Sequence, residues 1–318
     1  MATFYVARSE IITPLPWQTF ALPFSNALDA IDPAIRRAGR FDATLLIPPP
    51  DKQGMAQILR YHMGAAQDAE LKAVITLAAA RLVGTNGAEA AALARAAMAH
   101  ARGTGEALAS ALQRELDRRL PSRSENDDRR IALHEAGHAV VGLLSGLPAP
   151  HSLRIDRDGG AVIWPITSLH THDSALAEIR TFMGGRAAED VLLGNVSSGA
   201  GLGPESDLAH ATDLALKLET EWALGDGGLI WQPATPLNLR AGQPWLRDKL
   251  NHILDTAYAE ARTIIATHRD LVVELAEALL LERELTGPKL SKELEKIRRV
   301  GRWEEGLIGG SASSSRMI

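Results

Sequence analysis

Alanine and leucine recur at helical spacing through most of the chain, and this pattern constrains the fold more than any other feature. From about residue 53 onward it favours helices, because β-branched and aromatic clusters are confined to the first 50 residues and a short patch near 153–167. The 318 residues are 46% hydrophobic, enough for about two or three separate cores. We therefore expect a mainly α protein.

The composition excludes several classes of function. A formal net charge of -5 argues against nucleic acid as an obligate partner, because no basic footprint is available to neutralise phosphates. The absence of cysteine excludes disulfides, thiolate nucleophiles and cysteine-ligated zinc. The longest apolar runs, such as AVVGLLSG and LVVELAEALLLE, are shorter than the roughly 20 residues that cross a bilayer, and the N-terminus shows no secretory signal. We expect a cytoplasmic protein with no membrane span of its own.

The order of segments predicts two helical regions. Four helical segments separated by glycine-containing turns predict a small bundle over residues 53–120. The polar run PSRSENDDRR, residues 121–130, predicts a domain boundary. Beyond it we expect an opening helix, a strand or hairpin in SLRIDRDGGAVIWPI, and three longer helices up to residue 300. The Gly/Ser-rich end, within 301–318, predicts a disordered tail.

The apolar stretch IALHEAGHAVVGLLSG, residues 131–146, is interrupted by three polar side chains. His134 and His138 are four residues apart, so on a helix both rings face the same way and can converge on one metal ion. Glu135 lies beside them, where its carboxylate can take a proton from water and pass it to a leaving amine. The spacing therefore indicates a zinc hydrolase, with two hydrogen-bonded structural histidines as the alternative.

A zinc hydrolase needs a third protein ligand, and without cysteine this ligand must be His, Asp or Glu. The spacing leaves several candidates open: His151, His170, His172, His210, or an acid on a later helix. Asp207 begins a helix in SDLAHATDLALKLETEWALGD, where the simplest interpretation from the residues alone is an N-terminal cap.

The motifs resemble a known family. HEAGHAVVG, GGRAAEDVLLGNVSSGAG and SDLAHATDLALKLETEWALGD are similar, in this order, to the peptidase domain of FtsH-type AAA zinc metalloproteases. Upstream, SNALDAIDPAIRRAGRFDATLLIPPPD resembles the second region of homology of the AAA module, and the bundle resembles its helical lid. The resemblance implies an incomplete α/β AAA core fragment over 1–52, the lid over 53–120, and a helical zinc-peptidase domain over 121–300.

The resemblance implies a complete site. Zn²⁺ would be held by His134, His138 and Asp207, with Glu135 as general base. Glu189, which follows GGRAA, matches a carboxylate of the family and would accept a hydrogen bond from a ligand imidazole. A solvated charge on a helix is the alternative interpretation of Glu189.

The sequence departs from the family near the third ligand. The run AGLGPES, between Gly199 and Asp207, is longer than the family's usual approach to this aspartate. A remodelled loop would make Glu205 the alternative ligand. The region between the helix that carries HEAGH and the GGRAAED motif is shorter than usual in the family. We therefore expect the strand on the substrate side, and its specificity contacts, to differ from those of the family.

The N-terminal departure concerns ATP. The printed sequence contains no Gly-rich loop ending in Lys-Ser/Thr and no acidic pair following a strand, the groups that bind phosphates and magnesium. Asn26 matches the family's sensor asparagine, Arg37 and Arg40 match its arginine fingers, and Ala38 replaces a usual proline. Only the family resemblance therefore suggests ATP as a cofactor, and we expect no ATP hydrolysis by this chain alone. The two arginines would either reach a neighbour's nucleotide site or be surface charges.

The same departure affects the first 50 residues. In the resembled module WQTFALPF and ATLLIPPP are separated by the phosphate-loop strand, so we expect this region to be poorly packed. ATFYVAR, residues 2–8, would fill part of the gap by pairing with one of them.

Two functions follow. The first is a zinc metalloendopeptidase that cuts unfolded or flexible polypeptides without ATP. The alternative is an inactive or regulatory subunit that joins a complete FtsH-type protease. The resemblance implies a homo-oligomer, a hexamer in the family, or co-assembly with full-length relatives, and membrane association through such a partner.

Overall fold

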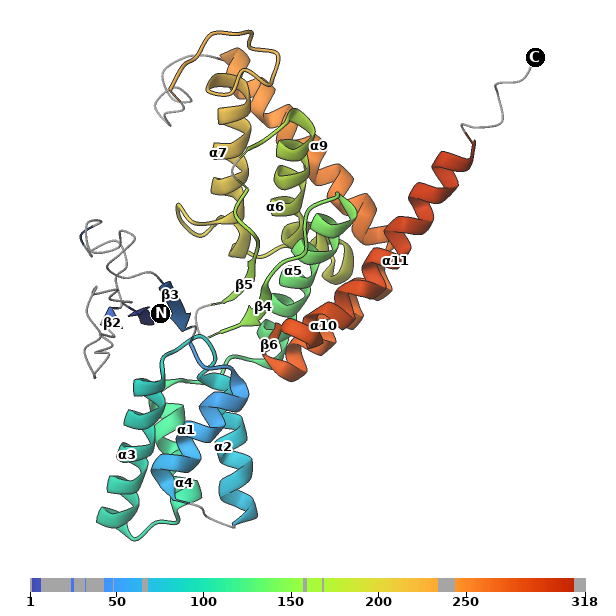
Figure 1. The fold of residues 1–318 in the computed structure, drawn as a ribbon. Helices are drawn as coiled ribbons and strands as arrows, with labels where there is room; N and C mark the ends of the chain where they lie inside the picture. Colours follow the sequence, from blue (N-terminus) through green and yellow to red (C-terminus); the bar gives the residue numbers. More distant parts are fainter. Residues whose placement is uncertain are drawn as a thin grey trace, which may run out of the picture. The chain divides into compact units, whose positions relative to one another are not determined.

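The computed structural model describes residues 2–6, 24–25, 32, 43–47, 49–64, 68–156, 159–167, 169–233 and 244–311. The chain divides into two compact units, Met1–Pro121 and Ser122–Ile318. The division falls at the start of the polar run that predicted a domain boundary. Helices dominate both units (Figure 1), which confirms the mainly α class.

The first unit begins with a small antiparallel sheet. Strand β1 (Ala2–Val6) lies between β2 (Phe24–Ser25) and β3 (Ala43–Ile47). In register, Ala2 lies opposite Ile47 and Val6 opposite Ala43. This pairing agrees with the hypothesis that ATFYVAR fills the gap beside ATLLIPPP.

Several predictions for the N-terminal region lie outside the described residues. They concern Asn26, Arg37, Ala38 and Arg40, together with the packing of most of the first 50 residues.

Four helices follow in the first unit: α1 (Lys52–Met63), α2 (Ala69–Arg81), α3 (Gly87–Thr104) and α4 (Leu108–Arg119). The first three begin where the side chains of Asp51, Asp68 and Asn86 accept backbone N–H groups, which removes unpaired donors from the first turn. The apolar faces of all four helices bury one core, which includes Met55 and Leu59 of α1 and Leu112 and Leu116 of α4. The predicted bundle is therefore present.

The second unit is built around two crossing helices, α5 (Glu125–Leu144) and α6 (His172–Leu193). Helix α6 also packs against α7 (Asp207–Thr220) and α9 (Pro244–Thr267), and α10 (Arg269–Glu282) packs on the other side of α5 (Figure 1). These helices share a single hydrophobic core. Because α5 is covered on several sides, its polar side chains His134, Glu135 and His138 are held inside the unit.

A small sheet accompanies α5. The hairpin of β4 (Ser152–Ile155) and β5 (Gly160–Ile163) confirms the predicted strand pair, with Arg154 opposite Ala161. The third strand, β6 (Glu284–Thr286), pairs with β4, so the order is β5-β4-β6. Within the described residues β5 is therefore an edge strand, and its outer side is not paired with another strand of the chain.

The C-terminal end differs from the prediction. Helix α11 spans Gly287–Ser311, so it continues past residue 300 into residues 301–311, which we predicted to be part of a disordered tail. Leu290, Leu294 and Ile297 recur at helical spacing and are buried, and Lys296 pairs with Glu293 one turn away. The prediction for 312–318 lies outside the described residues. Among the helices that the structure describes, none combines the length and apolar character that a membrane span requires.

Candidate metal centre

Helix α5 supplies three polar side chains to one interior face. Its first turn is capped by Ser124, whose hydroxyl accepts the backbone N–H of Asp127. His134, Glu135 and His138 are all buried, and the two imidazole rings lie with centroids 4.8 Å apart. The fully buried Val140 and Val141 anchor the next turn, and each contributes roughly 1.5–3 kcal/mol by its burial. The helix therefore holds both rings in a rigid setting.

Glycines let α5 and α6 approach each other closely at this site. A Cβ on Gly184 would lie 2.7 Å from the carbonyl oxygen of Gly137, and one on Gly137 would lie 2.5 Å from that of Gly184. A Cβ on Gly185 would lie 2.4 Å from Nε2 of His134. The Gly-Gly pair in the middle of α6, unfavourable for a helix by itself, is thus explained by packing against α5.

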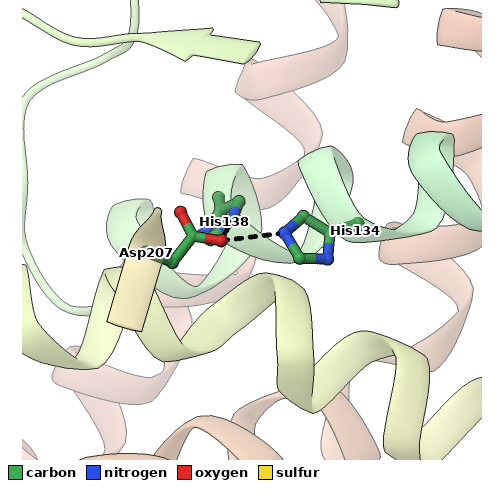
Figure 2. A group of neighbouring side chains, drawn as sticks. All are labelled: His134, His138 and Asp207. Carbon is green, nitrogen blue, oxygen red and sulfur yellow. Dashed lines mark hydrogen bonds and ion pairs between the residues drawn. The ribbon is translucent and has the colours of Figure 1, made fainter. Parts of the chain in front are cut away.

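Asp207 comes to the two rings from the start of α7. Its Oδ2 lies 3.0 Å from Nε2 of His134 and 3.3 Å from Nε2 of His138 (Figure 2). One potential ligand atom from each of the three side chains falls within 4.8 Å of the others. Ser206, and not Asp207, is the N-cap of α7, because its hydroxyl accepts the backbone N–H of Ala209. The Asp207 carboxylate is consequently directed at the imidazoles.

The other candidate ligands do not converge on the two imidazole rings. Glu205, the alternative acid, is 89% exposed at its side chain and lies 3.7 Å from His210. His170 is bound to Glu178 at 2.7 Å, and its ring stacks on Trp222. The three remaining candidate histidines, His151, His172 and His210, are solvent-exposed. Among the residues the structure describes, only His134, His138 and Asp207 form a group that could hold a metal ion.

The donor set fits a zinc ion. Nδ1 of His134 lies 2.8 Å from Oε1 of Glu189, and Nδ1 of His138 lies 2.7 Å from the carbonyl oxygen of Thr181. Both acceptors require a hydrogen on Nδ1, so in each neutral ring the lone pair is on Nε2, the atom that faces Asp207. Two imidazole nitrogens and one carboxylate are a donor set that zinc prefers in catalytic sites.

The partners that hold Glu189 itself were not predicted from the sequence. Arg130 donates to its Oε2 at 2.7 Å, and Ser197 donates its backbone N–H to the same oxygen at 2.7 Å and its hydroxyl to Oε1 at 3.0 Å. Glu189 is 2% exposed, so it is not the solvated charge of the alternative interpretation. The sequence held one signal for the contact between Arg130 and Glu189. Arg130 and His134 are four residues apart, so they lie on the same face of α5.

The charges of the site shift one another's pKa values. Burial raises the pKa of the Glu135 carboxyl, which makes it a stronger base. Burial lowers the pKa of His134, but hydrogen bonds to Asp207 and Glu189 outweigh it and raise the value to about 10. Burial alone would raise the pKa of Glu189, yet its bonds to His134, Arg130 and Ser197 lower it to about 2. Glu189 is therefore ionised at neutral pH.

A cavity of about 570 Å³ opens over these residues. Its lining includes the four polar side chains of the site on one side and the β5 segment with Val162 and Trp164 on another. A Cβ on Gly160 would lie 2.5 Å from Oε1 of Glu135, so β5 passes directly beside this carboxylate. The cavity therefore joins the candidate base, the candidate metal ligands and an edge strand.

Comparisons with known proteins agree with this geometry. Residues 122–235 match the model of peptidase family M41. The chain is 33% identical to ATP-dependent zinc metalloprotease FtsH 2 of Symbiobacterium thermophilum, over 81% of this chain and 48% of that protein. It is 34% identical to FtsH 1 of the same organism, over 85% and 48%, and 32% identical to the chloroplastic FTSH 7 of Oryza sativa subsp. japonica, over 86% and 36%.

The chain thus spans less than half the length of these relatives. The family match begins at residue 122, the first residue of the second unit, and contains the whole His134, His138 and Asp207 cluster. On this match, residues 122–235 form a peptidase family M41 domain, and the similarity to FtsH-type zinc metalloproteases extends through both units.

Proposed function

We propose that the chain is a zinc-dependent metalloendopeptidase that hydrolyses peptide bonds of unfolded or flexible polypeptides. One observation carries the proposal: both Nδ1 atoms are bound to acceptors, which leaves two Nε2 atoms facing Asp207 beside a buried carboxylate, Glu135. His134, His138 and Asp207 would hold the ion. Zinc at such a site supplies Lewis-acid chemistry, because it polarises a carbonyl group and makes water more acidic.

Glu135 then acts as general base and general acid. Its carboxylate takes a proton from the water whose oxygen attacks the scissile carbonyl carbon. When the C–N bond breaks, the carboxylic acid returns this proton to the leaving amine. The raised pKa of Glu135 suits both halves of this role.

The edge strand supports a polypeptide substrate. Strand β5 lines the cavity, and within the described part of the chain its outer side is not paired with another strand. An extended peptide that added to this edge would lie along the cavity next to Glu135. Only a segment that is already unfolded can present its backbone in this way, which favours flexible chains as substrates.

The test combines metal analysis with digestion of an unstructured protein such as casein. We expect about one zinc per chain and digestion without added ATP. Glu135→Gln should keep the zinc and lose roughly 10²- to 10⁴-fold in rate. Bound zinc with no digestion by the wild-type chain, together with co-purification of a complete FtsH-type ATPase, would instead support the regulatory subunit.

A further inference from the structure

Arg130 and His134 are neighbours on one face of α5, because they are four residues apart. Both side chains reach the same carboxylate on α6. His134 uses Oε1 of Glu189 and Arg130 uses Oε2. Arg130 is the last residue of the polar run 121–130, and it lies outside the motifs that supply the candidate ligands and base.

We propose that Arg130 is a positioning residue of the metal site, which holds Glu189 in the orientation that fixes the ring of His134. This inference rests on the proposed function, in which Nε2 of His134 binds zinc. Arg130 does not touch the ligand atoms and acts through Glu189.

The burial of Glu189 makes a charged partner necessary. Its side chain is 3% exposed, and an ionised carboxylate at such a place is unfavourable unless it is paired and hydrogen-bonded. Among its partners in the described residues, Ser197 is neutral, and His134 is neutral once its Nε2 is given to a cation. Arg130 is the partner that brings a positive charge to the Glu189 carboxylate.

The guanidinium group also has a second anchor. Its Nη2 donates to Oδ1 of Asn195 at 2.6 Å, and its Nη1 reaches the backbone oxygen of Asn195 at 3.2 Å. Asn195 follows directly after Gly194, whose left-handed conformation ends α6. The rigid fork of Arg130 therefore ties Glu189 to the first residue of the segment that leads to Asp207. Lysine carries the same charge but lacks this fork geometry.

The experiment compares zinc affinity in Arg130→Met, Arg130→Lys and Arg129→Met. Arg129 is the matched control, because it is adjacent on α5, carries the same charge and is exposed. Competition with a chromophoric chelator gives the zinc dissociation constant, and the visible spectrum of the Co²⁺-substituted chain reports ligand geometry.

We expect Arg130→Met to weaken zinc binding about 10- to 100-fold and to shift the Co²⁺ bands. Arg130→Lys should recover part of the affinity, and Arg129→Met should match the wild type. Wild-type affinity and an unchanged Co²⁺ spectrum in Arg130→Met would overturn the proposal. So would an equal loss of affinity in Arg129→Met, because the effect would then come from net charge.

Should Arg130→Met fail to fold, Asn195→Ala decides the question. This variant keeps the buried charge and removes only the side-chain anchor of the guanidinium. We expect it to weaken zinc binding by about 10-fold, and unchanged affinity would overturn the inference. A wild-type chain that binds no zinc would contradict the proposed function itself, whereas equal binding by wild type and variants contradicts only the role of Arg130.

Discussion

Nε2 of His134 lies 3.0 Å from Oδ2 of Asp207, although 73 residues separate them in the chain. The contact depends on where α7 begins relative to α5. It also distinguishes Asp207 from Glu205, which is two residues away and points into solvent.

The first prediction concerns this third ligand. Asp207→Asn keeps the size of the side chain but removes its negative charge, so we expect zinc affinity to fall by about 100-fold or more. Glu205→Gln is the control and should bind zinc as the wild type does. Chelator competition measures both variants. Equal losses in the two variants, or a loss only in Glu205→Gln, would show that the ligand has been assigned to the wrong acid.

A second prediction concerns the close crossing of α5 and α6. Alanine normally stabilises a helix over glycine by about 1 kcal/mol, but the Cβ of Gly184→Ala would lie 2.7 Å from the backbone oxygen of Gly137. We expect the free energy of unfolding of the second unit to fall by about 1–3 kcal/mol in denaturant titrations.

The control for Gly184→Ala is Gly103→Ala, a substitution of the same kind in α3 of the first unit. A Cβ there meets no atom within 4 Å, so this variant should stabilise the first unit by about 0.5–1 kcal/mol. Stabilisation by Gly184→Ala of the same size would contradict the packing argument.

The third prediction separates catalysis from metal binding. Gly160→Ala places a Cβ 2.5 Å from Oε1 of Glu135, and the carboxylate must move aside. Because Glu135 is not among the candidate ligands, zinc affinity should stay within about twofold, while kcat falls about 10- to 100-fold. Ile163→Ala, at the exposed end of the same strand, should leave kcat near the wild-type value. Loss of zinc in Gly160→Ala would contradict the prediction that catalysis can be impaired without a loss of metal binding.

The fourth prediction is a pH dependence of zinc binding. Hydrogen bonds to Asp207 and Glu189 overcome the effect of burial and raise the pKa of His134 from 6.5 to about 10. The ring therefore keeps its extra proton at neutral pH, and zinc must displace that proton from Nε2. Against the effect of burial, Asp207 raises the pKa of His138 as well. The apparent association constant should therefore rise by about tenfold or more per pH unit between roughly pH 7 and 8, and level off as the pH passes about 10. Chelator competition corrected for the chelator's own protonation checks this, and a flat profile would contradict it.

Local sequence patterns were sufficient for the helical elements that surround the site. The spacing of His134 and His138 placed both rings on one face of α5, and the Asp-Gly-Gly turn indicated the β4-β5 hairpin. These features depend on residues a few positions apart, whose geometry follows from helix and strand periodicity. Helix α11 was not predicted as a continuous helix, because the Gly/Ser-rich end of the chain favoured a disordered tail from residue 301. Its buried residues Leu290, Leu294 and Ile297 nevertheless carry the helical period.

The sequence by itself determined that the chain is mainly helical and that two imidazoles and a carboxylate share one helix. Through family resemblance it also singled out Asp207, which spacing alone left open among several histidines and acids. Only the tertiary structure decided which acid faces the rings, that Thr181 and Glu189 accept their Nδ1–H groups, and that Arg130 holds Glu189. The reason is physical: these contacts join α5, α6 and α7, and their geometry is set by how closely the helices pack.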